Sequence, residues 1–444
     1  MKIIILGNGV SGITAARFIR KWSDHDISVI SDETDYFFSR TALMYVYMGH
    51  MRPTDIRPYE DWFWKKNRIE LLRARVTAVD FKTKTLKASN GETVSYDKLI
   101  LATGSQSNKF GWPGQELDGV HGLYSWQDME AMERHSEGLK RAVIVGGGLI
   151  GIEMAEMFHS RHIPVTFLVR ENSFWDAILP PPESAMVNRH ILEHGIDLQL
   201  GTELKEILQD EHGKCRAVNT SKDTLIDCGF VGLTVGVSPN VGFLKNTELE
   251  IKRGILVNEY LETNISDVYA IGDCVEIRNP QPGRRPIEAV WYTGRIMGET
   301  LAHSICGRRT AYNPGIWFNS AKFLDIEYQV YGEIQAKLPD NQAELYWEHP
   351  DGKKSIRLNY ERASGRVLGF NLMGVRYRQE VCEKWLRTGA HIEVVLQRLG
   401  LANFDPEFYP QHESELVAAY NRQTGKNVLL KQKRGLSAVL EFLR

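Results

Sequence analysis

The sequence predicts an α/β fold in which one strand–turn–helix–strand unit occurs twice, followed by a C-terminal α+β region. Three observations support this prediction. A glycine-rich turn at residues 7–12 separates an apolar, β-branched run from a helical stretch. The same arrangement returns roughly 140 residues later, at residues 146–151. From Ala311 onward, short strand-like segments joined by polar turns replace it.

Composition and charge are those of an ordinary globular chain. The 444 residues suggest about three domains, and 43% are hydrophobic and 25% charged. The 54 basic and 56 acidic side chains nearly cancel, so we expect no nucleic-acid binding. No apolar run reaches the ~18 residues of a membrane span, and no signal peptide is visible. A cytoplasmic location is therefore expected, and scattered cysteines without CxxC spacing agree with it: Cys215, Cys228, Cys274, Cys306 and Cys382.

The first glycine turn lies between a strand at residues 2–6 and a helix at residues 13–21. In a GxGxxG turn, one glycine permits the tight turn, one admits a pyrophosphate and one lets the helix approach the strand. The free N–H groups at the helix start then hold the phosphates. Asp32 and Glu33 follow the next strand about 20 residues later, where a carboxylate can bind ribose hydroxyls. The candidate phosphate-binding residues of this turn are Gly7, Gly9, Val10, Ser11 and Gly12.

The second glycine turn lies between strand 142–145 and a helix at residues 152–161. A further strand ends at Val169, where an acid would serve NADH, and Arg170 comes next. An arginine there suits the 2′-phosphate of NADPH. Two alternatives stay open: Arg170 is a surface charge, or Glu171 reaches a ribose. The candidate dinucleotide-binding residues of this turn are Gly146, Gly148, Leu149, Ile150 and Gly151.

Later segments complete the two units and add a third region. Apolar strands are expected at residues 96–104, at 230–237 with Gly236 near the end, and at 268–273, and a helix is expected at 289–305. The C-terminal region shows strand patterns at residues 317–331, 343–347, 355–360 and 366–373, and helical patterns near residues 377–388 and 392–399.

Four of these segments, taken in order, resemble the FAD-dependent pyridine nucleotide-disulfide oxidoreductases. They are residues 7–12, 101–104, 146–153 and 268–273, and the resemblance covers roughly residues 1–310. It implies two Rossmann-like dinucleotide-binding domains, one for FAD and one for NAD(P)H. The FAD domain is expected to be discontinuous, over 1–112 and 241–310. The NAD(P)H domain would span 113–240, and an α+β interface or capping domain would span 311–444.

The resemblance also assigns residues to the flavin. Asp273 would contact its ribityl or pyrophosphate region, and the backbone at Val76 would meet the adenine. Ala102, Thr103 and Gly104 would pass close to FAD. The start of the helix near residue 290 would lie along the isoalloxazine. The cofactor-binding set implied by these segments is completed by Gly236, Ala289 and Val290, with Trp291 at the flavin itself.

The stretch Phe37 to Leu43, FFSRTAL, indicates a branch of the family. It contains no cysteine, which disfavours a dithiol relay beside the flavin. It is similar to the YSRPxLS segment of ferredoxin, putidaredoxin and rubredoxin reductases, a branch shared with apoptosis-inducing-factor-like proteins. Arg40 would then lie near the FAD phosphates. Thr41 replaces the usual proline, and Tyr45 stands where a flavin-contacting lysine is expected.

Two further segments support this branch. Glu153 is present as the glutamate that this lysine would pair with at flavin N5. Residues 317–320, WFNS, resemble the WFWS opening of the C-terminal domain, with Asn319 in place of the second tryptophan. Trp291 and Trp317 could equally be core aromatics.

We therefore expect an FAD-dependent NAD(P)H oxidoreductase, with Glu153 and Trp291 at the reacting centre. The electron acceptor is expected to be a small redox protein such as ferredoxin or rubredoxin. The alternatives are dioxygen, a quinone or a small disulfide as acceptor, or an apoptosis-inducing-factor-like redox sensor.

We expect no metal site, and a homodimer is possible. An acidic carrier would be guided by basic residues that otherwise form a solvated surface: Arg295, Lys322, Lys426, Lys431, Lys433 and Arg434.

Overall fold

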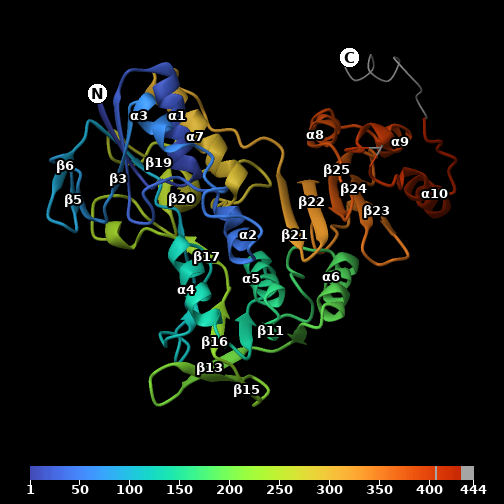
Figure 1. Ribbon diagram of the computed structural model, residues 1–444. Helices are drawn as coiled ribbons and strands as arrows, with labels where there is room; N and C mark the ends of the chain where they lie inside the picture. Colours follow the sequence, from blue (N-terminus) through green and yellow to red (C-terminus); the bar gives the residue numbers. More distant parts are fainter. Residues whose placement is uncertain (406–407, 432–444) are drawn as a thin grey trace. The chain divides into compact units, whose positions relative to one another are not determined.

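The computed structural model describes residues 1–405 and 408–431 (Figure 1). The chain divides into two compact units. The first contains Met1–Arg170 and Ile196–Pro314, and the second contains Glu171–Gly195 and the chain from Gly315 onward. Nothing in the sequence indicates that residues 171–195 leave the first unit. Among the described residues, no helix is both long and apolar enough to cross a membrane.

A five-stranded parallel sheet with the order β3-β2-β1-β7-β19 forms one half of the first unit. After their first residue, β1 and β7 are apolar runs buried on both faces, as in other parallel sheets, and β2 is buried over its four middle residues. The long helices α1 and α7 pack against each other beside it (Figure 1). The elements are β1 Lys2–Leu6, α1 Val10–Trp22, β2 Asp26–Ser31, α2 Leu43–Tyr47, α3 Asp61–Lys66, β3 Ile69–Arg73, β7 Lys98–Leu101, β19 Val268–Ala270 and α7 Trp291–Ile305.

A second five-stranded parallel sheet, with the order β12-β11-β10-β16-β9, repeats this design. In both sheets the strand before the glycine turn is central, and its neighbours follow the order of a doubly wound fold. The α/β class with two Rossmann-like units is thus confirmed. The elements are β9 Val120–His121, α4 Trp126–Ser136, β10 Ala142–Val145, α5 Leu149–Ser160, β11 Val165–Val169, β12 Asp197–Leu200 and β16 Phe230–Leu233.

Small sheets and single turns of helix are inserted between the strands of the two parallel sheets. The expected strand at residues 230–237 is interrupted: β16 ends at Leu233, and Gly236 (φ +85°) turns the chain into β17. The small sheets consist of β4 Val76–Asp80 with β5 Thr85–Ala88 and β6 Thr93–Ser95, β8 Ser105–Ser107 with β17 Val237–Pro239, β13 Leu204–Gln209 with β14 Cys215–Thr220 and β15 Leu225–Asp227, and β18 Ile255–Val257 with β20 Val275–Ile277. The short 3₁₀ turns are η1 Arg40–Ala42, η2 Gly242–Leu244 and η3 Gly272–Cys274.

The second unit is built on an antiparallel sheet with the order β21-β22-β25-β24-β23. The single strand expected at residues 317–331 is wrong, because the chain reverses at Leu324 (φ +57°) and Asp325 to form a hairpin. The helix α10 was also not expected. The elements are α6 Pro181–Glu193, β21 Phe318–Phe323, β22 Ile326–Gly332, β23 Gln342–Glu348, β24 Ser355–Glu361, β25 Val367–Met373, α8 Gln379–Arg387, α9 Ile392–Gln397, η4 Leu399–Leu401 and α10 Glu413–Thr424.

The two faces of this sheet carry different side chains, because successive residues of a strand point to opposite faces. Ile356 and Leu358 of β24 belong to an apolar core shared with α8, α9 and α10. Arg357, between them, forms an ion pair with Glu183 of α6. Figure 1 shows α6 on the other side of the sheet from α8 and α9. The segment 171–195 therefore joins the second unit through this charged contact and through the rings of Phe174 and Trp175, which pack against Phe323 of β21.

Candidate active site

The two glycine turns have the same geometry. Gly7 and Gly146 have φ values of +112° and +113°. A Cβ on Gly7 would lie 2.0 Å from the Ala102 carbonyl oxygen, and one on Gly146 would lie 2.6 Å from that of Thr234. These two positions therefore require glycine, because a side chain would disfavour the backbone conformation and would collide with the neighbouring carbonyl group.

The remaining glycines of the turns are of two kinds. At Gly12 and Gly151 a side chain would collide with the backbone, whereas at Gly9 and Gly148 the space is open. A Cβ on Gly12 would lie 2.1 Å from the Gly7 oxygen, and one on Gly151 would lie 2.3 Å from the Gly146 oxygen. Gly9 and Gly148 cap α1 and α5, and a Cβ on either would meet no atom within 4 Å. No side chain caps either helix. Both turns thus present uncapped N–H groups toward open space, which suits a pyrophosphate.

A cavity of about 890 Å³ opens at the carboxyl ends of β1, β2, β7 and β19. It lies where the strand order of the first sheet reverses, which is the usual ligand position in an open α/β sheet. It is in the size range of cofactor sites, about 300–1,000 Å³. Its lining includes, of the residues predicted for the site, Gly7, Gly9, Val10, Ser11, Asp32, Glu33, Arg40, Val76, Ala102, Thr103, Gly104, Ile150, Glu153, Asp273, Ala289 and Trp291.

The other predicted residues do not line this cavity. Gly12 is buried in the contact between α1 and β1. Val290 is the N-cap of α7, and Arg170 is exposed directly after β11. The rest belong to the second glycine turn or to the link between β16 and β17: Gly146, Gly148, Leu149, Gly151 and Gly236.

Two residues of the second sheet's helix α5 reach the cavity of the first sheet. Ile150 and Glu153 line it together with Trp291 from the first turn of α7. A ligand lying on the first sheet therefore extends to the helix that follows the second glycine turn. Tyr45 does not line the cavity; its ring stacks near His50, with ring centroids 6.3 Å apart, while Thr41 and Met44 form the wall.

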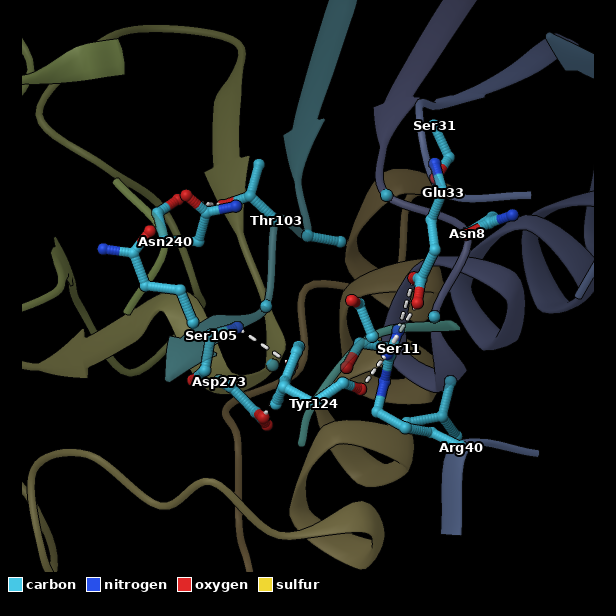
Figure 2. A pocket seen from close by; sticks show the side chains of 18 of the residues that line it. Asn8, Ser11, Ser31, Glu33, Arg40, Thr103, Ser105, Tyr124, Asn240 and Asp273 are labelled. Atoms are coloured by element: carbon cyan, nitrogen blue, oxygen red, sulfur yellow. Dashed lines mark hydrogen bonds and ion pairs between the residues drawn. The ribbon is translucent and has the colours of Figure 1, made fainter. Parts of the chain in front are cut away.

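Arg40 and Glu33 form a bidentate ion pair at the cavity wall (Figure 2). Arg40 Nη1 donates to Glu33 Oε1 at 2.8 Å, and Nη2 donates to Oε2 at 2.6 Å. The backbone N–H of Trp126 also donates to Glu33 Oε1. Burial lowers the pKa of Arg40, but the hydrogen bond to Glu33 and its negative charge outweigh this and raise it. Both Glu33 oxygens are thus occupied, whereas Asp32 presents an exposed carboxylate to the cavity.

Tyr124 is a cavity residue that the sequence did not reveal. Its hydroxyl accepts from the Ser105 N–H at 2.9 Å and donates to Asp273 Oδ2 at 3.3 Å (Figure 2). The Arg40 guanidinium lies 4.6 Å from the centre of its ring. Burial raises the pKa values of both Tyr124 and Asp273. Tyr124 belongs to no motif, and it meets Asp273 only across 149 residues of chain.

No cysteine lines the cavity. Cys274, next to Asp273, is fully buried and its Sγ contacts the Ile271 and Leu101 carbonyl oxygens. This agrees with the absence of cysteine from residues 36–44. A thiol cannot therefore relay electrons from the cavity wall.

Comparison with known proteins gives the same result as the geometry. Residues 1–297 match the family model described as pyridine nucleotide-disulphide oxidoreductase. An NADH-rubredoxin oxidoreductase of Clostridium acetobutylicum is 30% identical over 342 residues, covering 76% of this chain and 83% of that one. An NADH oxidase of Methanocaldococcus jannaschii is 30% identical over 338 residues, covering 74% and 75%. The crystal structure of an NADH:rubredoxin oxidoreductase from Clostridium acetobutylicum is 25% identical, with a TM-score of 0.68, and the match covers 88% of this chain and 94% of that one.

These matches confirm the resemblance inferred from the sequence, including its cofactors, FAD and NAD(P)H. The chain belongs to the pyridine nucleotide-disulphide oxidoreductase family and is an NAD(P)H-dependent FAD oxidoreductase.

Proposed function

We propose that the chain passes electrons from a nicotinamide, through FAD in the cavity, to a small redox protein such as rubredoxin or ferredoxin. One observation carries this proposal: a single cavity reaches from the first glycine turn to Glu153 on α5, and no thiol lines it. The arrangement suits electron exchange between two cofactors without a covalent step on a cysteine.

The cavity residues supply distinct parts of an FAD site. The N–H groups at Val10 and Ser11 start α1 and face the pyrophosphate position. Asp32 is the carboxylate for the adenosine ribose, because Glu33 is held by Arg40. The backbone at Val76 borders the adenine. Asp273 borders the ribityl chain, with its carboxyl oriented by the Tyr124 hydroxyl.

The flavin ring would lie between α5 and the start of α7. When bound, FAD supplies the chemistry that accepts a hydride from the nicotinamide and releases electrons to the acceptor. Trp291 and Ala289, which line the cavity near the start of α7, would border the ring on one side, and Glu153 would border it from α5. Ile150 and the half-buried Glu153 side chain help to exclude water and orient the reacting rings.

The nicotinamide dinucleotide is assigned to the second glycine turn. The open position at Gly148 admits its pyrophosphate, and the N–H groups of Leu149 and Ile150 begin α5. Arg170, exposed after β11, would pair with the 2′-phosphate of NADPH; the alternatives are a surface charge at Arg170 and a ribose contact from Glu171.

The proposed domains follow from these assignments. The FAD domain comprises residues 1–112 and 241–310, the NAD(P)H domain comprises residues 113–240, and residues 311–444 form the interface or capping domain.

The acceptor follows from the relatives. The Clostridium relative is named for rubredoxin, a small electron carrier. Of the basic residues expected to guide an acidic carrier, Lys426 is paired with Glu393 and Arg295 lies over Trp291. Lys433 and Arg434 lie outside the described residues. We further infer a cytoplasmic location and a homodimer.

A second candidate acceptor is dioxygen. It is favoured by the equal identity, 30%, of the Methanocaldococcus NADH oxidase. Anaerobic stopped-flow mixing separates the two. The flavin band is expected to bleach with NADPH or NADH and to return on mixing with oxidised rubredoxin or ferredoxin. Faster return with dissolved dioxygen than with either carrier would favour an oxidase, and no bleaching with either nicotinamide would exclude both candidates.

A further inference from the structure

A cluster of two histidines and an aspartate lies in the second unit, away from the cavity. His190 and His194 lie on α6 and at its C-terminal cap, and Asp325 lies at the turn between β21 and β22. The sequence between the histidines is HILEH, an HxxxH spacing, which places both imidazoles on one face of a helix. The expectation of no metal site overlooked this spacing.

The three side chains present their ligand atoms to one another. One nitrogen of each imidazole and one oxygen of Asp325 all lie within 4.8 Å of each other. His194 Nε2 is 3.6 Å from Asp325 Oδ1, and His190 Nε2 contacts the same oxygen. Ligands at about 2.0–2.2 Å from a tetrahedral zinc ion lie roughly 3.3 Å apart. Small side-chain adjustments therefore bring all three atoms to a shared ion.

The surroundings of the two imidazoles indicate which ring nitrogens are available to bind a metal ion. His194 Nδ1 is 2.9 Å from the His190 carbonyl oxygen, which can only accept. Nδ1 therefore carries a proton, which leaves Nε2, the nitrogen that faces Asp325, as the one available to a metal ion. Metal-binding histidines commonly have their other nitrogen oriented by a carbonyl oxygen in this way. On His190, Nδ1 is buried 3.7 Å from the Glu193 carboxylate, too far for a hydrogen bond, and Nε2 is the nitrogen that faces Asp325.

The three side chains of the cluster differ in their exposure to solvent. The side chain of His190 is 2% exposed, that of His194 27% and that of Asp325 62%. An ion can therefore enter from solvent beside Asp325 while the buried imidazole holds it from within. With three protein ligands, a fourth position stays open to water.

We propose that His190, His194 and Asp325 bind a divalent transition metal of the zinc class, with water as the fourth ligand. Imidazole nitrogens with a carboxylate oxygen suit Zn²⁺, Co²⁺ and Ni²⁺. The ion would fasten α6 to the β21–β22 hairpin and so hold the segment 171–195 in the second unit. Because such an ion binds only the folded site, it stabilises that unit.

The test uses the full-length, FAD-loaded protein after treatment with a chelator. Titration with Co²⁺, followed by its visible absorption beyond the flavin band, is expected to show one tetrahedral ion per chain. Zn²⁺ should displace it and raise Tm. In His194→Asn with Asp325→Asn, which change the two less buried ligands, Co²⁺ affinity should fall at least about tenfold and the Zn²⁺ effect on Tm should disappear.

A second cluster, Asp118, His121 and His135 in the first unit, provides the matched control. The variant with His121→Asn and His135→Asn should keep the Co²⁺ spectrum and the Zn²⁺ shift. Absence of saturable Co²⁺ binding to the unmodified protein would overturn the proposal. Binding that survives loss of His194 and Asp325 but disappears without His121 and His135 would also overturn it.

Discussion

Arg40 and Glu33 are joined by two parallel hydrogen bonds at the wall of the cavity in the first unit, and the same guanidinium donates to the Tyr124 carbonyl oxygen at 2.5 Å. One side chain thus ties the loop after β2 to the segment before α4. We expect Arg40→Ala to weaken FAD binding by on the order of tenfold, about 1.4 kcal/mol, because the bond to Tyr124 is lost and the Glu33 carboxylate keeps only the backbone N–H of Trp126. Fluorescence of released flavin during dilution measures this.

An exposed pair near Arg40 provides the control for this variant. Arg52 pairs with Asp55 on the surface, so Arg52→Ala removes an arginine without touching the cavity. It should retain flavin as the unmodified protein does. Equal flavin loss in both variants would show that the Arg40 pair has no specific role in the cofactor site.

The open positions of the two glycine turns allow the two cofactors to be separated. Gly9→Val adds a side chain where a Cβ meets no protein atom, so the fold should persist while the pyrophosphate of FAD is displaced. Gly148→Val should keep FAD but lose reduction by NAD(P)H. The readouts are flavin absorbance per chain and anaerobic bleaching by nicotinamide.

Gly12→Val is the contrasting variant. Its Cβ would lie 2.1 Å from the Gly7 oxygen, so we expect misfolding and no soluble flavoprotein. If Gly9→Val and Gly148→Val both retain flavin and both lose nicotinamide reduction, the assignment of one cofactor to each turn is wrong.

Local patterns in the sequence predict the parts of the fold that short-range physics determines. Both glycine turns, the strands before them and the helices after them follow from residues adjacent in the chain. Features that depend on distant segments were not predictable. Tyr124 meets Asp273 only because two halves of the first unit fold together. The reversal at Leu324 was missed because β21 and β22 read as one continuous strand.

The placement of residues 171–195 rests on long-range contacts that the sequence does not show, among them a buried ion pair and the ring contacts of Phe174 and Trp175 with Phe323. A helix between β11 and β12 is expected to cover the second parallel sheet, as in other doubly wound folds. Here Glu183 on that helix pairs with Arg357 on β24, 174 residues later. The metal-binding spacing at His190 was visible in the sequence, but its third ligand, Asp325, comes from the unexpected turn.

Tyr96 leads to a prediction about pH. Its hydroxyl is buried and makes no hydrogen bond within the described chain. Burial, with the nearby charges of Asp80 and Asp267, raises the pKa of Tyr96 to about 12, above the usual value of about 10. The unfolded chain therefore loses this proton first. The contribution to stability is complete below pH 10 and is lost as pH rises through 12.

Tyr96→Phe tests this directly. At pH 7 the variant should be as stable as the unmodified protein or slightly more stable, because an unsatisfied hydroxyl is removed. Between pH 10 and pH 12 its free energy of unfolding should fall less steeply. Urea unfolding at a series of pH values gives both quantities. Parallel curves for the two proteins across that range would contradict the raised pKa.

The buried pair of Arg357 and Glu183 should control the stability of the second unit. Both side chains are at most 1% exposed; Arg357 Nε and Nη2 donate to the two Glu183 oxygens at 2.6 and 2.8 Å, and Asn371 donates to one of them. Glu183→Ala should lower the free energy of unfolding by about 3–5 kcal/mol, because it leaves a buried guanidinium with only Glu344 as a charged partner. Urea denaturation monitored by tryptophan fluorescence measures the loss.

The double variant distinguishes an unpaired charge from a simple loss of packing. Glu183→Met with Arg357→Met replaces the pair by apolar side chains of similar length, and it should regain most of the stability that Glu183→Ala loses. Flavin content should stay unchanged in all of these proteins, since neither residue lines the cavity. The contrary result would be a double variant that is no more stable than Glu183→Ala. It would mean that the attraction between the two charges stabilises the unit by more than the free energy lost in burying them.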